Sequence, residues 1–134
     1  MNWDKTYSMI KKSHMILYVE DQQKSTAFYT KLLNQTPTLS VPGMTEFNLS
    51  ESTILGLMPS AGIKNLLGNA IDEPQPSDKI PRAELYLVVE NIKEYINHAE
   101  DLKAKILSPL EERDWGHQVI YFEDLDGYVI AFAQ

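Results

Sequence analysis

The sequence of 134 residues contains no cysteine. That absence excludes disulfide bonds, thiolate nucleophiles and cysteine-ligated zinc or iron–sulfur centres, and it is typical of a reducing compartment. No apolar run is long enough to cross a bilayer or to serve as a signal sequence, so we expect a cytoplasmic protein with no membrane partner. The 6 glycines are isolated, and none belongs to a dinucleotide-binding or phosphate-binding loop.

A basic surface is also missing. The chain has 19 acidic and 12 basic side chains, which gives a formal net charge of −7. Nucleic-acid binding depends on Lys and Arg side chains that neutralise phosphates, so the charge argues against nucleic acid as a partner. The acidic balance is compatible with a cationic small molecule. An apolar content of 43% predicts a folded domain with a sizeable core.

What the chain does contain is an internal repeat. Residues 14–21 resemble residues 84–91, because in both an apolar strand ends in Val-Glu followed by Asp or Asn. Residues 43–57 correspond in the same way to residues 116–132. Two copies of such a unit usually stack to bury a common face. We predict one domain over residues 1–134, with repeat one at about 13–58, a connector at 59–81 and repeat two at about 82–134.

Each repeat has the pattern of a βαβββ unit. Alternating or continuous apolar residues predict strands at 13–19, 38–41, 45–49, 53–58, 83–89, 106–110, 118–122 and 128–132. Helical spacing predicts one helix that starts after an Asp21 N-cap and ends near Leu33, and another from about 91 to 105. The connector is rich in proline and is expected to hold one helical turn around 63–67. The predicted fold class is α+β, with two βαβββ repeats that form curved mixed sheets around a cleft.

Several short segments carry a family resemblance. Residues 25–29 in the first helix, Asp114-Trp115-Gly116 and residues 124–130 resemble the glyoxalase/bleomycin-resistance/dioxygenase superfamily, also called vicinal oxygen chelate proteins. Residues 82–87 together with 113–116 resemble a bacterial glyoxalase-like group within it. The resemblance extends over residues 13–133. It implies a homodimer that binds a small organic molecule in a cleft.

The resemblance also implies where a metal would bind. Metalloenzymes of the superfamily take ligands from the first and fourth strands of each unit, and the matching positions here are His14, Gly56, Glu84 and Ala131. Only His14 and Glu84 carry donor atoms, and two protein ligands hold a divalent ion poorly. We therefore expect no metal site of that type and no cofactor. A divalent metal that recruits a third ligand is the alternative, with Glu46, His117 or Tyr121 as candidates.

The candidate site residues come from the first strand of each repeat and from the end of the second repeat. His14 and Tyr18 share one face of the first strand, and Glu84 and Tyr86 share the corresponding face of the first strand of repeat two. Flat rings beside a carboxylate suit a cationic or aromatic ligand. We predict His14 and Glu84 as catalytic residues, and Tyr18, Tyr86, Arg113, Trp115 and Tyr121 as ligand-binding residues. The alternatives are an ordinary hydrogen-bonded histidine at His14 and a glutamate paired with Arg82 or Arg113 at Glu84.

These observations favour a small-molecule-binding protein of the glyoxalase/bleomycin-resistance type that lacks the glyoxalase metal site. Another hypothesis is an enzyme, either a metal-dependent lyase, isomerase or dioxygenase, or a metal-free enzyme that uses Glu84 as a base beside His14. A third is an interaction module that keeps the fold without a ligand. The sequence leaves open whether any reaction is catalysed, because a fold does not determine a function.

Overall fold

The computed structural model describes residues 6, 8–75 and 80–134. Its elements, in chain order, are β1 (Ser13–Val19), α1 (Gln22–Leu33), β2 (Leu39–Val41), β3 (Met44–Asn48), β4 (Thr53–Pro59), α2 (Ser60–Leu67), the short 3₁₀ helix η1 (Gly68–Ala70), β5 (Glu84–Val88), α3 (Ile92–Asp101), β6 (Lys105–Glu112), β7 (Gln118–Glu123) and β8 (Val129–Ala133). The α+β class and the two βαβββ modules predicted from the sequence are confirmed.

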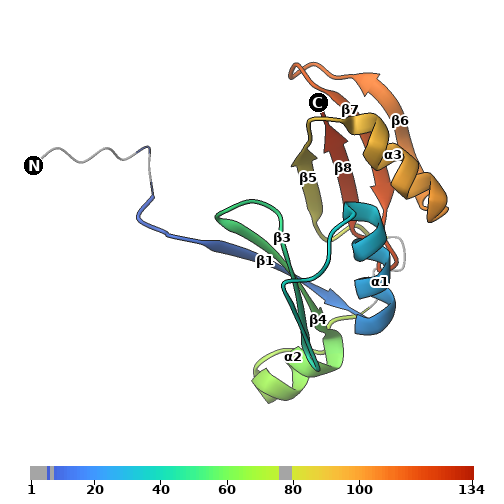
Figure 1. The fold of residues 1–134 in the computed structure, drawn as a ribbon. Helices are drawn as coiled ribbons and strands as arrows, with labels where there is room; N and C mark the ends of the chain where they lie inside the picture. Colours follow the sequence, from blue (N-terminus) through green and yellow to red (C-terminus); the bar gives the residue numbers. More distant parts are fainter. Residues whose placement is uncertain (1–5, 7, 76–79) are drawn as a thin grey trace, which may run out of the picture.

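Each module forms one four-stranded sheet, with the orders β1-β4-β3-β2 and β5-β8-β7-β6. β1 runs parallel to β4 and β5 runs parallel to β8, while the remaining pairs are antiparallel. β1 and β5 are therefore edge strands of their own sheets. In Figure 1 the first module lies below the second, and α1 and α3 lie beside one another where the modules meet.

A helix covers one face of each sheet, and the core lies beneath it. α1 packs on the face of the first sheet that carries Leu17, Leu55 and Leu57, all at most 2% exposed. Because side chains alternate along a strand, residues 14, 16 and 18 of β1 point to the other face. We call this second face, in either sheet, the open face. The open faces carry all the candidate site residues that lie on strands.

The turn before β8 joins the two modules. The buried Asp124 carboxylate accepts a 2.5 Å hydrogen bond from the Tyr29 hydroxyl of α1. The two carboxylate oxygens of Asp126 accept from the Glu20 amide at 2.8 Å and from the Ser25 hydroxyl at 3.2 Å. Gly127 has a φ of +86°, a conformation that glycine adopts without steric strain. This turn thus fixes the start of α1 against the second sheet.

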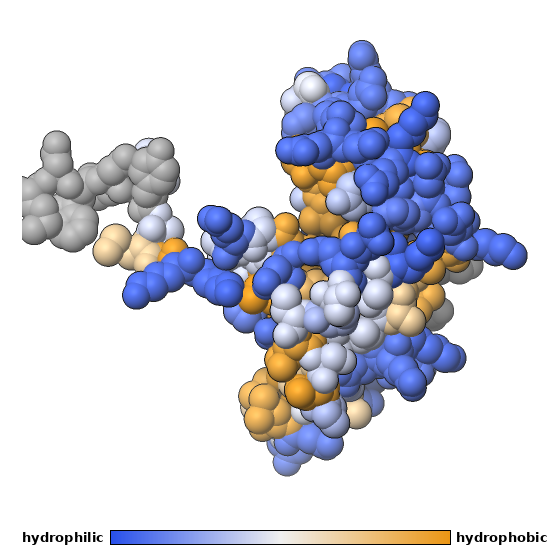
Figure 2. All heavy atoms as spheres, in the orientation of Figure 1, coloured by the Kyte–Doolittle hydropathy of each residue, from blue (hydrophilic) through white to orange (hydrophobic). Residues whose placement is uncertain are grey.

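Two elements differ from the sequence prediction. α3 ends at Asp101 rather than near residue 105, because Lys103 adopts a left-handed φ of +55° that redirects the chain into β6. The connector holds a helix of 8 residues rather than a single turn, anchored by the buried Ile63. Figure 2 shows apolar atoms over α2, where Leu66 and Leu67 are exposed. None of the helices in the described ranges has the length and apolar character needed to cross a membrane.

Candidate functional site

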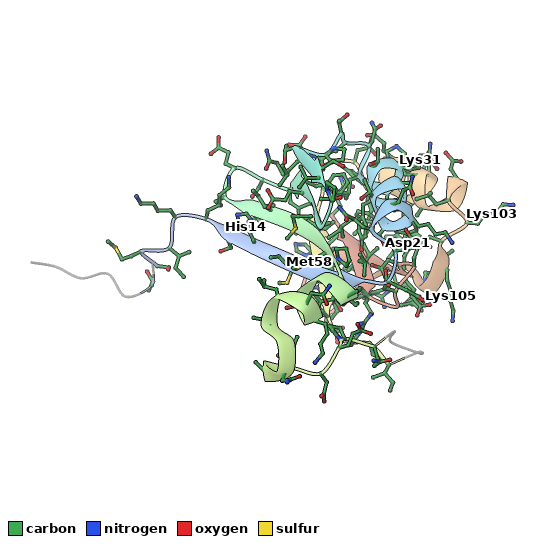
Figure 3. All side chains as sticks on the ribbon, turned by 90° about the horizontal axis from the view of Figure 1, so that it is seen from below. His14, Asp21, Lys31, Met58, Lys103 and Lys105 are labelled. Carbon is green, nitrogen blue, oxygen red and sulfur yellow. The ribbon has the colours of Figure 1, made fainter. Side chains whose placement is uncertain are left out.

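The open face of the first sheet carries His14 close to a carboxylate. His14 lies on β1, near the end of the strand that is distant from α1 (Figure 3), and its Nδ1 is 3.5 Å from Glu46 Oε2 on β3. The pair crosses β4, because His14 lies opposite Ile54 and Glu46 lies opposite Gly56. The His14 and Glu46 side chains are 39% and 21% exposed. The surface around this pair is apolar, with Ile16, Leu39 and Val41 exposed.

Two of the four positions that the family resemblance assigns to a metal, Gly56 and Ala131, carry no donor atom and have little free space around them. A Cβ at Gly56 would lie 3.1 Å from Ile16 Cγ1 and 3.2 Å from Met44 Sδ, so neighbouring apolar side chains fill the space that a donor would need. Ala131 is fully buried. No three His, Asp or Glu side chains gather as a ligand set within residues 6, 8–75 and 80–134. His14 and Glu84 lie on different sheets, His14 beside Glu46 and Glu84 near Tyr121.

The open face of the second sheet carries an aromatic cluster, which we define as Tyr86, Arg113, Trp115, His117 and Tyr121. Tyr86 and Tyr121 flank Ala131 on either side, because both are its register partners. They cover the small buried side chains of this face, Val119, Ala131 and Ala133. The Tyr86 hydroxyl receives the Trp115 Nε1–H at 2.8 Å and is 2.7 Å from His117 Nδ1. Trp115 remains 57% exposed and presents a ring to the outside.

Arg113 holds the rim of this cluster. Its Nη2 donates to the Ser108 hydroxyl and to the carbonyls of Pro109 and Val119, at 2.9 to 3.0 Å. Its guanidinium carbon lies 5.2 Å from the centre of the Tyr121 ring, within cation–π range. Its ion pair, at 3.4 Å, is with Glu111. Arg113 therefore ties β6 to β7 and supports Tyr121 from the side.

Charge also reaches this face from β5. Glu84 is exposed and follows the same strand alternation as Tyr86. Burial raises the pKa of the Tyr121 hydroxyl, and the negative charge of Glu84 raises it further, while Arg113 opposes the shift. The phenol of Tyr121 is thus kept protonated, and it can donate a hydrogen bond. The open face of the second sheet combines an acidic acceptor, a phenol donor and flat rings.

The structure divides the predicted site residues between the two sheets. Tyr86, Arg113, Trp115 and Tyr121 lie together with Glu84 on the second sheet, and His14 lies on the first. Tyr18 lines a separate pocket of ≈ 370 Å³ with Glu20, Arg82 and Asp126. A groove of ≈ 550 Å³ runs between the modules along β5, bounded by α3, the end of α1 and the β3–β4 turn. Tyr86 lines that groove as well as belonging to the aromatic cluster.

Two residues that the sequence named only as optional third metal ligands take part in these arrangements. The ring of His117 stacks on that of Tyr86, with the ring centres 5.9 Å apart. Glu46 was only one of three optional third ligands. The repeat contains a signal for Glu46, because it lies opposite Gly56 as Tyr121 lies opposite Ala131. Glu46 and Tyr121 are therefore equivalent positions of the two modules.

The fold and these open faces define the class of protein. Residues 12–134 match the family of glyoxalase-like domains, and the chain belongs to that family. No curated protein matches the sequence. The expected superfamily membership is thereby confirmed.

Solved structures show the same fold. A glyoxalase-related enzyme from Fulvimarina pelagi superposes with a TM-score of 0.73 at 18% identity, over 90% of this chain and 85% of that one. A glyoxalase/bleomycin resistance protein/dioxygenase from Nocardioides gives 0.75 at 19% identity, over 96% and 85% of the two chains. A lactoylglutathione lyase from Agrobacterium tumefaciens gives 0.68 at 17% identity, over 90% of each chain. These superpositions establish a shared fold.

Proposed function

We propose that this chain is a cytoplasmic small-molecule-binding protein of the glyoxalase/bleomycin-resistance type that works without a bound metal. The aromatic cluster beside Glu84 is the observation that carries the proposal. Rings at Tyr86, Trp115 and Tyr121 offer stacking surfaces, and the Glu84 carboxylate adds a negative charge at their edge. A flat aromatic molecule that carries a positive charge fits this combination. The similarity to a solved glyoxalase/bleomycin resistance protein/dioxygenase supports the same reading.

We further propose that the working form is a homodimer. β1 and β5 are edge strands, and each carries exposed apolar side chains, with Ile16 at 39% and Val88 at 63%. An exposed apolar edge favours pairing with a second strand or covering by another chain. In such a dimer the open face of the first sheet of one copy would cover the aromatic cluster of the other. The His14–Glu46 pair would then lie across the ligand from Glu84.

The experiment is a thermal-shift screen of cationic and neutral aromatic compounds against the untagged protein, followed by calorimetric titration of any hit. Trp115→Ala should weaken binding by about 1 kcal/mol, or roughly fivefold in Kd, because it removes an exposed ring from the cluster. Leu125→Ala is the matched control, since Leu125 is 58% exposed on a different turn. An equal loss of affinity in both variants, or no loss of affinity in Trp115→Ala, contradicts a ligand site at the aromatic cluster.

The second candidate is an enzyme, and the His14–Glu46 pair is the observation that favours it. An imidazole beside a carboxylate is a common acid–base arrangement, and Glu84 would be a further base. A metal-dependent lyase, isomerase or dioxygenase would need a third donor brought in by a second copy. Elemental analysis of protein purified without chelator separates these options. One tightly held metal per chain, lost in His14→Ala and in Glu84→Ala, would favour the metalloenzyme over the binding protein.

A further inference from the structure

Three side chains of the aromatic cluster form one continuous hydrogen-bonded chain. The Trp115 Nε1–H donates to the Tyr86 hydroxyl oxygen at 2.8 Å, and that oxygen lies 2.7 Å from His117 Nδ1. Both distances are short and typical of strong hydrogen bonds. Tyr86 comes from β5, whereas Trp115 and His117 come from the turn between β6 and β7. The Tyr86 hydroxyl therefore has one hydrogen-bond partner on each side, in addition to a ring that can stack on a ligand.

The chemistry of the three groups determines which atom donates and which accepts in each of the two hydrogen bonds. An indole nitrogen is only a donor, so the Tyr86 oxygen must accept from Trp115. A neutral imidazole has one donor and one acceptor nitrogen. If His117 Nδ1 is the acceptor, the Tyr86 hydroxyl proton has a partner within the chain. If Nδ1 instead donated, the Tyr86 proton would need another acceptor, and the described residues record none for it. Protonation of His117 at Nε2 is therefore the arrangement that completes the hydrogen-bonded chain among the described residues.

The backbone holds the two turn residues in place for this contact. The Arg113 amide donates to the His117 carbonyl at 2.8 Å, and the Gly116 amide donates to the Arg113 carbonyl at 3.1 Å. Gly116 has a φ of +97°, a conformation that side-chain-bearing residues rarely adopt. This tight turn projects Trp115 and His117 toward the same side, onto Tyr86. The stacking of the Tyr86 and His117 rings, inclined by 30°, restrains them further.

We propose that Tyr86 is a catalytic residue of this open face and that His117 is the positioning base behind it. The Tyr86 oxygen takes a proton from a bound planar ligand that carries an acidic N–H or O–H group, while its own proton passes to His117 Nδ1. The ligand loses one proton, His117 gains one and becomes imidazolium, and Tyr86 stays a phenol. The Trp115 N–H stabilises the negative charge that develops on the oxygen during the transfer. This proposal rests on the proposed function for the position of the ligand on the aromatic cluster, and it adds a proton transfer at that position.

The test needs no natural ligand, because a phenol with a base behind it reacts readily with electrophiles. The probe is 4-methylbenzenesulfonyl fluoride, and labelled tyrosines are located by peptide mass spectrometry. Tyr86 should be sulfonylated at least about tenfold faster than Tyr121, since a positioned base accelerates proton removal by ~10²-fold or more. His117→Gln should abolish most of that advantage. His98→Gln is the matched control, because His98 Nδ1 is 3.2 Å from a backbone carbonyl, that of Leu32, on the far side of the sheet.

A second measurement reads the hydrogen-bond direction itself. Long-range ¹H–¹⁵N correlation spectra should show His117 as the Nε2–H tautomer in the wild type. An Nδ1–H tautomer overturns the proposal, as does sulfonylation of Tyr86 at the rate of Tyr121, or a rate that His117→Gln leaves unchanged. These readouts are independent of ligand binding. If the ligand screen fails while Tyr86 is selectively labelled, the proposed function is wrong and the activated tyrosine stands.

Discussion

At the scale of single residues, the carboxyl group of Asp124 is buried where the two modules meet. It is 7% exposed and accepts hydrogen bonds from the Tyr29 hydroxyl and from the amides of Asp126 and Tyr128. Burial raises its pKa above the ordinary value of 3.8, although the three hydrogen bonds oppose the shift. Burial, together with the nearby Asp124 charge, also raises the pKa of Tyr29. The phenol therefore remains a donor at all physiological pH values.

The raised pKa of Asp124 predicts a pH dependence of stability. The folded state keeps the proton of the Asp124 carboxyl group to a higher pH than the unfolded state does. The contribution of this group to the free energy of unfolding is therefore fully present below pH 3.8, and it is lost as pH rises through the folded-state pKa. Relative to Asp124→Asn, the wild type should therefore lose unfolding free energy as pH rises from about 4 to 7. Urea unfolding at each pH measures the difference. Asp101→Asn, at an exposed carboxylate paired with Lys31, should show no such trend; a flat difference for Asp124→Asn would refute the argument.

At the scale of elements, α1 begins with a cap that the sequence already indicated. Asp21 has extended backbone angles, and its carboxylate accepts the Lys24 amide at 3.0 Å. Such a cap satisfies an amide that the helix cannot pair internally. The helix ends at Leu33, and the following residue, Asn34, adopts a left-handed φ of +51° and donates its backbone amide to the Lys31 carbonyl. Both ends of α1 are thus determined by local chemistry.

Asp21→Ala should destabilise the protein by about 1 kcal/mol, because it leaves the Lys24 amide without its side-chain acceptor. Asp21→Asn should retain most of the stability, since the amide oxygen can accept the same bond. Chemical denaturation followed by circular dichroism gives both values. If the two variants lose equal amounts of unfolding free energy, the charge of Asp21 rather than its hydrogen bond stabilises the helix. If neither loses stability, the cap contributes nothing.

The elements were more predictable than the site. The alternation of apolar residues predicted every strand within about two residues, and the Asp21 cap predicted the start of α1. Both signals are local in the sequence. α3 was predicted too long because nothing local marks Lys103 as the residue that turns left-handed. The sequence did not predict which side chains on different strands lie close together. The contact of His14 with Glu46, and that of Tyr86 with His117, depend on register and on a turn conformation, which a single sequence does not specify.

At the scale of the whole molecule, the exposed apolar residues of the edge strands are the basis of the proposed dimer. Val88 is 63% exposed on β5, and a lysine there should prevent an apolar edge from being covered by a second copy. Size-exclusion chromatography with light scattering should give a dimer for the wild type and a monomer for Val88→Lys. Leu125→Lys, at a comparably exposed turn residue, should remain dimeric. A monomeric wild type at about 100 µM, well above the Kd range of specific homodimers, would refute the proposed dimer.

The turn that joins the modules has a consequence for the order of folding. Tyr29 and Ser25 lie in the first helix, but their acceptors Asp124 and Asp126 follow 95 and 101 residues later. Contacts at such separation form slowly, because a long segment of chain must be closed before they add stability. On the ribosome, the Tyr29 hydroxyl cannot reach its partner until residue 124 has left the exit tunnel. The first module is therefore made first but gains these contacts only after most of the second module has been synthesised.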